Sequence, residues 1–204
     1  MTARIITFLF ITFVFVNACK ETKKEEKTEK EIETKTEVPQ DQLQVKVNQL
    51  EDSSQAAWKF MTEADDQKIA YTKRLLDEIS YTPKYNVIKH AKLMERCAKL
   101  KAKRYDMVNL NSEKIDKYDI ATDSLLKDVK TLVLSTPNVE NYPLCSELLN
   151  DISALDNDVV IHRVKYDNWA MQYNSILKDH SEELKAMGNP YDSLKTKGTF
   201  QLVE

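Results

Sequence analysis

The chain has 204 residues, of which 31% are charged and 42% are hydrophobic, and its formal net charge is −3. A weakly acidic chain lacks the positive field that grips nucleic acid, and a mean hydropathy of −0.53 excludes a protein with many membrane spans. Only two residues are glycine, whereas a β-rich fold needs many turn residues. The composition therefore predicts an all-α protein.

Residues 1–18 have the pattern of a bacterial lipoprotein signal peptide. Arg4 precedes an apolar run from Ile5 to Val16 that only two threonines interrupt. The run is too short to cross the ~30 Å hydrocarbon core of a membrane, but it suits the core of a signal peptide. It ends in Ala18-Cys19, which resembles the lipobox, where a small residue precedes the cysteine that receives a diacylglyceryl group. The alternative is an uncleaved anchor helix with an incidental cysteine.

Residues 19–40 are predicted to be the lipidated Cys19 followed by a disordered tether. Between Lys20 and Pro39 there are six lysines, seven glutamates and almost no apolar residue, so this stretch cannot bury surface. An isolated helix is the alternative. Lys20, directly after the cysteine, favours the outer membrane by resemblance to known sorting patterns. We therefore expect a cell-envelope protein held to the membrane by its N-terminal lipid, facing the periplasm or the surface.

Residues 41–188 carry apolar residues three or four positions apart in four segments, as amphipathic helices do. The segments cover about 41–80, 84–108, 113–134 and 141–187. Short connections imply antiparallel neighbours, so we predict an antiparallel up-down four-helix bundle with a long first and fourth helix and a short second and third helix. The long helices should overhang the short ones at one end. This overhang would bring together two sets of apolar residues: Leu43, Val47 and Leu50 with Leu177, Leu184 and Met187.

Prolines and glycines indicate where these helices begin and end. Thr82-Pro83 is expected to supply the N-cap and first residue of the second helix, which would carry Ile88 on its apolar face. The fourth helix is predicted to run without interruption from about Pro143 to Gly188, with Trp169 on its apolar stripe. Residues 189–204 are expected to form a C-terminal tail.

Polar side chains lie beside the apolar stripe of the predicted fourth helix. Arg163 and Asp167 are separated by four residues, so we expect them to be neighbours on the helix surface. A catalytic interpretation takes the group as a carboxylate–arginine–tyrosine constellation, and a structural one takes it as a network that fixes helix register. We favour the structural interpretation because no nucleophile with an adjacent base accompanies the group. The expected network comprises Asp156, Asn157, Arg163, Tyr166, Asp167, Tyr173 and Asn174.

The same stretch carries a resemblance to a known family. Asn157-Asp158-Val159, Arg163, Tyr166-Asp167 and Tyr173-Asn174-Ser175-Ile176 resemble the C-terminal signature of the LemA family. Glu140-Asn141-Tyr142-Pro143 is similar to the entry into that helix in the family, and Ala57-Trp58 is similar to part of its first helix. The resemblance implies an antiparallel helical bundle anchored in the bacterial envelope, here in a lipoprotein form, with no established enzymatic activity.

The remaining candidate residues point to no metal or cofactor. Cys97 and Cys145 are expected to be free thiols, because the predicted layout places them at heights roughly 15–20 Å apart. No Glu-x-x-His pair precedes His90, His162 or His180, so the ligands of a di-iron bundle are missing. We expect His90 and His162 to cap or line the bundle.

The predicted second segment carries a run of basic residues: Lys84, Lys89, Lys92, Arg96, Lys99, Lys101, Lys103 and Arg104. It is interpreted as a solvated face that answers acidic neighbours, or alternatively as a contact for anionic lipid head groups or glycans. The leading functional hypothesis is a non-enzymatic envelope lipoprotein that acts as an interaction or scaffold module for an unidentified envelope protein. The alternative is a periplasmic ligand-binding or hydrolytic module that acts on anionic glycan or lipid through this run and the Arg163 group.

Overall fold

The computed structural model describes residues 39–200, in which every regular element is a helix. The α-helices are α1 (Gln40–Ile79), α2 (Val87–Leu100), α3 (Ser112–Ser135), α4 (Pro143–Asp179) and α5 (Ser181–Met187). Single 3-10 turns occur at η1 (Lys101–Lys103), η2 (Val139–Asn141) and η3 (Tyr191–Ser193). The all-α prediction is confirmed for this part of the chain. The predicted signal peptide, Cys19 and nearly all of the tether lie outside the described residues.

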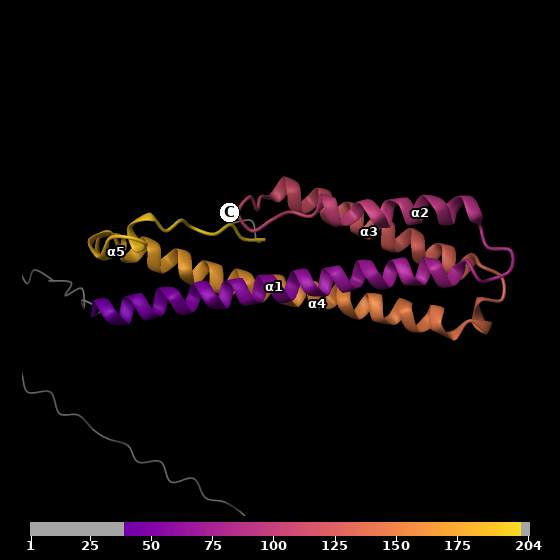
Figure 1. The fold of residues 1–204 in the computed structure, drawn as a ribbon, viewed down its shortest axis with the longest axis horizontal. Coiled ribbons are helices and arrows are strands. Elements are labelled where there is room, and N and C mark those ends of the chain that lie inside the picture. Colours follow the sequence, from indigo (N-terminus) through magenta and orange to yellow (C-terminus); the bar gives the residue numbers. More distant parts are fainter. Residues whose placement is uncertain (1–38, 201–204) are drawn as a thin grey trace, which may run out of the picture. The chain divides into compact units, whose positions relative to one another are not determined.

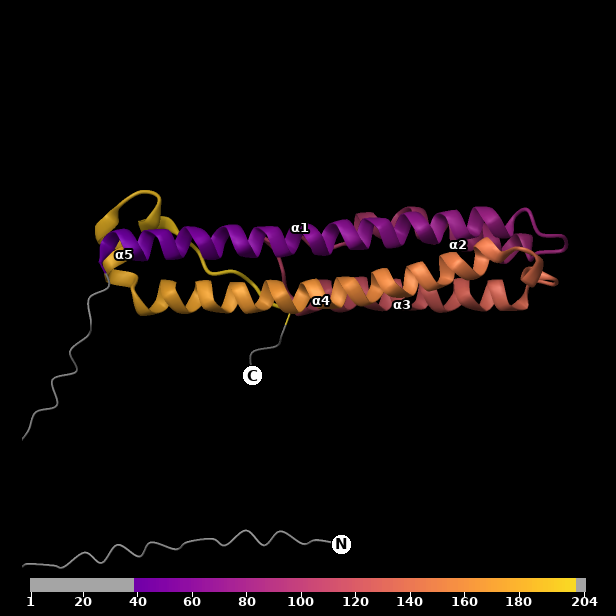
Figure 2. The ribbon, with the colours of Figure 1, turned by 90° about the horizontal axis from the view of Figure 1, so that it is seen from below.

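The long helices α1 and α4 make the most extensive helix–helix contact and run antiparallel (Figures 1 and 2). The shorter α2 and α3 pack on each other and lie beside the C-terminal half of α1 (Figure 1). One hydrophobic cluster draws buried residues from all four helices, including Leu75 of α1, Leu93 of α2, Leu132 of α3 and Leu148 of α4. Within residues 39–200, no helix combines the length and apolar character needed to cross a membrane.

A second hydrophobic cluster lies where α1 and α4 extend past α2 and α3. Leu43, Val47 and Leu50 of α1 are buried there with Tyr173 and Leu184. Leu177 and Met187 pack against the same cluster, so the predicted contact between the two overhanging ends is confirmed. Residues of the following turn, Tyr191 and Leu194, add further cover.

The predicted uninterrupted helix over 141–187 is wrong, because it breaks at His180. The backbone of His180 leaves the helical region, with φ −119° and ψ 31°, and α5 begins at the next residue. The break turns α5 so that Leu184 is buried against the second cluster. Gly188, at φ 70°, then ends α5 at the predicted place.

The second helix begins later than predicted and buries a different face. Its N-cap is Asn86, whose side chain accepts the N–H of Lys89 at 2.9 Å. Thr82 instead donates its hydroxyl to the Ile79 carbonyl at the end of α1, so the predicted Thr82-Pro83 cap is wrong.

The buried face of α2 consists of Leu93, Cys97 and Leu100. Ile88, predicted to be apolar core, is 73% exposed because it lies about 140° around the helix from Leu93. Trp169 of α4 is likewise 36% exposed, whereas its neighbour Ala170 is buried.

Candidate functional site

The polar residues of α4 meet a part of the chain that the sequence did not connect with them. After η3, residues 195–200 continue without helix and run back toward the loop between α2 and α3 (Figure 1). We call residues 195–200 the C-terminal segment. It was predicted only as a tail, yet its main chain and two of its side chains bind the α1–α4 pair.

Side chains of α4 bind the main chain of this segment. The Asn174 amide donates to the Lys197 carbonyl at 2.8 Å and accepts the Lys197 N–H at 2.7 Å. The Tyr166 hydroxyl donates to the Gly198 carbonyl at 3.0 Å. An asparagine amide bonded in this way presents the same donor and acceptor pair as the edge of a β-strand.

Phe200 anchors the end of the C-terminal segment. Asp167 accepts its N–H at 2.9 Å, and its ring stacks on Trp58 with the centroids 5.9 Å apart. Tyr105 and Tyr166 meet the same ring edge-to-face, at 5.4 and 5.8 Å. Such aromatic pairs contribute roughly 0.5–1.5 kcal/mol each beyond the area that they bury. The phenylalanine therefore occupies an aromatic pocket built from α1, α4 and the loop after α2.

Lys197 occupies a second, acidic subsite. Its ammonium lies 2.8 Å from the Glu51 carboxylate of α1 and 4.8 Å from the centre of the Tyr173 ring. Burial opposes ionisation of Glu51, but hydrogen bonds from Lys197 and Gln55 outweigh it and lower the pKa of Glu51. Burial, together with the charge of Glu51, raises the pKa of Tyr173 to about 12, so this phenol is protonated at neutral pH.

Arg163 is held by α3 and by the loop that precedes it. Its two terminal nitrogens donate to the two Asp119 oxygens at 2.7 and 2.6 Å, and one also donates to the Tyr105 hydroxyl at 2.6 Å. Burial opposes the charge of Arg163, yet these hydrogen bonds raise the guanidinium pKa above its ordinary value. The carboxylate that Arg163 engages is thus that of Asp119, whereas Asp167 turns to the C-terminal segment.

The seven predicted residues therefore do not form one network. Four of them contact the C-terminal segment, as described above: Tyr166, Asp167, Tyr173 and Asn174. Asp156 lies elsewhere and accepts a hydrogen bond from the Lys68 ammonium at 2.9 Å. Asn157 is exposed.

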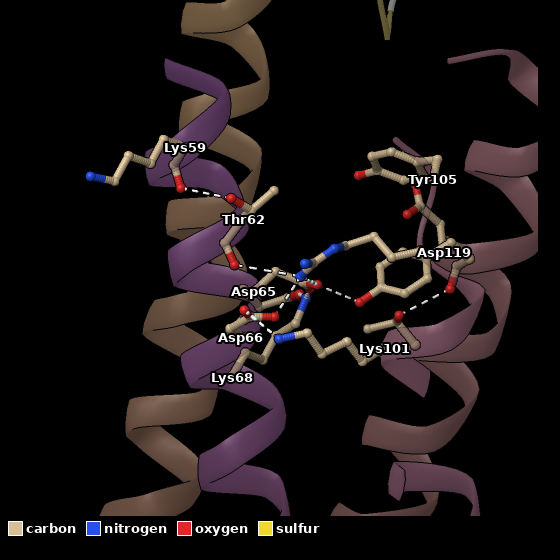
Figure 3. Close-up of polar contacts among 12 residues, drawn as sticks. Lys59, Thr62, Asp65, Asp66, Lys68, Lys101, Tyr105 and Asp119 are labelled. Carbon is tan, nitrogen blue, oxygen red and sulfur yellow. Dashed lines mark hydrogen bonds and ion pairs between the residues drawn. The ribbon is translucent and has the colours of Figure 1, made fainter. Parts of the chain in front are cut away.

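A buried ionic cluster, shown in Figure 3, was missed by the sequence reasoning. Asp65 and Lys68 of α1 are only 2% and 3% exposed. The Lys68 ammonium lies 3.1 Å from Asp65 and 2.9 Å from Asp156 of α4. Arg104 donates to Asp65 at 2.9 Å, and the Tyr118 hydroxyl of α3 donates to the same carboxylate. The cluster joins α1, α3, α4 and the loop after α2.

A signal for this cluster was present in the sequence. Met61, Asp65, Lys68, Thr72 and Leu75 are spaced three or four apart, so the two charges fall on the apolar face of the first helix. Charges on a buried face are seldom left unpaired, and the spacing could have directed attention to a partner from another helix.

The basic run pairs with acidic neighbours, as the first interpretation expects, but Arg104 is not on a solvated face, because its side chain is 14% exposed and pairs with the buried Asp65. Lys101 lies 2.8 Å from Asp66, and Arg104 lies 2.7 Å from the same residue. Arg96 pairs with Asp128 of α3, and Lys99 pairs with Glu95 one turn earlier in α2. Half of the run is thereby paired within the described chain.

Cys97 and Cys145 are free thiols, as predicted, and the structure buries both of them. Cys97 donates weakly to the Ile69 carbonyl at 3.6 Å. Burial raises the pKa of the Cys97 thiol and of the Cys145 thiol. Both residues belong to the hydrophobic cluster of α1–α4 and behave as apolar core residues.

The histidines pack against helix surfaces and ends. A ring nitrogen of His90 lies 2.9 Å from the Leu76 carbonyl, near the end of α1, and the His162 ring stacks on Phe60. His180 lies at the break after α4, with a ring nitrogen 3.5 Å from Glu183. Within residues 39–200, no group of three His, Cys, Asp or Glu side chains could hold a metal ion.

The polar side chains around the C-terminal segment are suited to hydrogen bonding with a peptide main chain. Burial raises the pKa of Tyr105 and of Tyr166 to about 12, so at neutral pH both phenols are donors. Asn174 offers a donor and an acceptor, and Asp167 offers acceptors.

No protein-family model, curated protein or solved structure matches the chain.

Proposed function

We propose that this chain is a bacterial cell-envelope lipoprotein of the LemA-like type, anchored through Cys19, that works as a non-enzymatic interaction or scaffold module. The leader, the Ala18-Cys19 ending and the hydrophilic sequel support the anchor. Lys20 supports the outer membrane. The family resemblance supports a helical envelope protein without enzymatic activity.

We further propose that α1–α4 form one antiparallel up-down four-helix bundle. The apolar cluster that draws on all four helices supports this arrangement. Two ion pairs support it as well: Arg163 with Asp119 joins α4 to α3, and Asp156 with Lys68 joins α4 to α1. A rigid helical module of this kind presents faces of fixed geometry to a partner.

An exposed apolar surface on α4 carries the interaction proposal. We define this apolar surface by its residues Val160, Ile161, Val164 and Met171, which lie within about 100° of one another around the helix. Val160 is 55% exposed and Val164 is 48% exposed. Phe60 and Trp169 lie on another side of α4, where they line a shallow groove together with His162 and Lys165. Single exposed apolar residues are ordinary, but a group of four on one side of a helix is typical of a protein contact.

Crosslinking and pull-down of the acylated protein test the interaction. A lysine at Val164 places a charge in the apolar surface, so the V164K variant should lose the recurrent partner. The matched control is I120K, which makes the same change at an exposed position of α3 that is 69% accessible. The proposal fails if no partner recurs with the unmodified protein, or if both variants lose it equally.

Labelling with palmitate tests the anchor separately. Cells that carry Cys19→Ser should lose the label, whereas cells that carry Cys145→Ser should keep it, because that thiol is buried in the core. Undiminished label in the Cys19→Ser chain would contradict the lipoprotein assignment.

A further inference from the structure

We propose that the surface of α1 and α4 that residues 197–200 occupy, here called the groove, is a recognition site for an extended peptide that presents Lys-Gly and, two residues after the glycine, an aromatic residue. Residues 197–200 of the chain occupy this groove as an intramolecular ligand. A partner protein that carries the same pattern would bind by displacing them. The site is distinct from the exposed apolar surface and does not depend on lipid anchoring.

The first step is the way in which the groove binds main chain. Asn174 makes two hydrogen bonds to Lys197, Tyr166 makes one to Gly198, and Asp167 accepts one from Phe200. All four bonds go to backbone atoms of an extended chain, and all three groove side chains come from α4. Extended peptides are commonly recognised through such main-chain bonds, with side-chain pockets adding specificity.

The second step is specificity, which comes from three positions. Glu51 and the Tyr173 ring select a cation at the first position. At the second position glycine is favoured, because a Cβ on Gly198 would lie only 3.1 Å from the Leu110 carbonyl oxygen and 3.2 Å from its Cβ, so that Leu110 would have to shift. The fourth position enters the pocket of aromatic rings.

The third step is that the intramolecular ligand can be released. The C-terminal segment has no helix of its own, and its residues 197–200 are only partly buried. Its first two residues, Lys195 and Thr196, are exposed and connect residues 197–200 to Leu194, which packs against the second cluster. A tethered ligand has an effective concentration of about 1 mM, so it suppresses binding from solution without abolishing it.

The partner is therefore defined by the ligand already seated in the groove. It must present a basic residue, a glycine directly after it and an aromatic residue two positions later, in extended conformation. The acidic Glu51 at one end and the aromatic pocket at the other fix the direction in which such a segment lies. The chain's own segment then acts as a competitor that keeps the groove filled until the partner arrives.

Binding of a fluorescent peptide to the full-length chain in mild detergent tests this proposal. The probe is the seven-residue peptide Lys-Thr-Lys-Gly-Thr-Phe-Gln, and its matched control has alanine in place of phenylalanine. The Phe200→Ala chain, whose own anchor is removed, should bind the probe at least roughly tenfold more tightly than the unmodified chain. The control peptide should bind that chain at least roughly tenfold more weakly.

Two further variants separate recognition from a folding defect. Gly198→Val should also expose the groove, because its side chain would press against Leu110, and helical circular dichroism should be unchanged because neither residue lies in a helix. Adding Asn174→Leu to either variant should abolish probe binding. Equal binding of the probe by the unmodified and opened chains, or equal binding of both peptides, would overturn the proposal. So would a mass measurement in which the opened or unmodified chain forms a dimer by exchanging residues 197–200.

Discussion

At the residue scale, the buried charges are the most demanding feature of the chain. Asp65 forms ion pairs with Arg104 and Lys68 and accepts a hydrogen bond from Tyr118, while only 2% of its surface is exposed. Removing a charge from water costs several kcal/mol, and these partners must offset that cost. Because the partners come from different elements, the cluster specifies how those elements are registered against one another.

Replacing Asp65 by alanine should lower the free energy of unfolding by about 3–5 kcal/mol, because Lys68 and Arg104 lose the buried carboxylate that they share and keep only the more exposed Asp156 and Asp66. The matched control is Asp66→Ala. The Asp66 side chain is 38% exposed, so this substitution should lower the free energy of unfolding by no more than about 1 kcal/mol. Urea unfolding followed by circular dichroism gives both values. Equal effects of the two substitutions would show that burial of the cluster has little energetic consequence.

The two cysteines permit a second test at this scale. Their thiol pKa values are raised by burial, so both remain protonated and covered at neutral pH. A disulfide-exchange reagent at pH 8 should react slowly with the folded Cys19→Ser chain and rapidly with both of its thiols in denaturant. Rapid reaction of a thiol in the folded chain would contradict the packed core around Cys97 and Cys145.

At the element scale, the C-terminal segment is docked in part by a titratable contact. The pKa of Glu51 is lowered in the folded chain from its ordinary 4.5 because Lys197 and Gln55 bond its carboxylate. A lowered carboxyl pKa contributes stability above the unfolded value of 4.5, and this contribution is lost as pH falls through the folded value.

We therefore expect the C-terminal segment to undock more readily as pH falls below 4.5. Hydrogen exchange of the Lys197 and Phe200 amides reports docking directly, since both N–H groups are bonded to α4. Glu51→Gln is the control, because it keeps the shape but removes the titration. The two amides should be better protected from exchange in the unmodified chain than in Glu51→Gln. This difference in protection should be greatest at neutral pH and should vanish in acid. A constant difference between the two chains would contradict the prediction.

The sequence predicted the helices better than it predicted what they bind. The long amphipathic periods of α1, α3 and most of α4 gave correct elements because their apolar spacing is sustained over many turns. The short α2 has few turns from which to read a phase, and Ile88 was placed on the wrong face. The break at His180 carries no glycine or proline, so local chemistry gave no warning of it.

The candidate site was predicted in part. The sequence analysis named Tyr166, Asp167, Tyr173 and Asn174, but as part of one network that fixes helix register rather than as contacts of the C-terminal segment. Their partners could not be inferred, because Lys197, Gly198 and Phe200 lie in a segment without periodicity and approach α4 through a turn. Long-range docking of this kind depends on the tertiary path of the chain rather than on any local pattern.

At the scale of the whole described unit, two apolar clusters share the same pair of helices. Leu50 lies in the cluster near the start of α1, and Leu132 lies in the cluster that includes α2 and α3. The helices α1 and α4 pass through both clusters without a break between them. The aromatic group around Trp58 and Phe200 lies between the two along α1. This continuity links the stability of each cluster to that of the other.

Residues 39–200 should consequently unfold in a single cooperative transition. Leu50→Ala and Leu132→Ala each remove a fully buried side chain, so each should cost about 2–5 kcal/mol of unfolding free energy. If the clusters are coupled through α1 and α4, either substitution shifts the whole transition, and circular dichroism and tryptophan fluorescence keep one common midpoint in urea. Leu134→Ala, at a position that is 69% exposed, is the control and should shift the midpoint little. Two separated transitions in the Leu50→Ala chain would show instead that the two clusters unfold independently, despite the helices that they share.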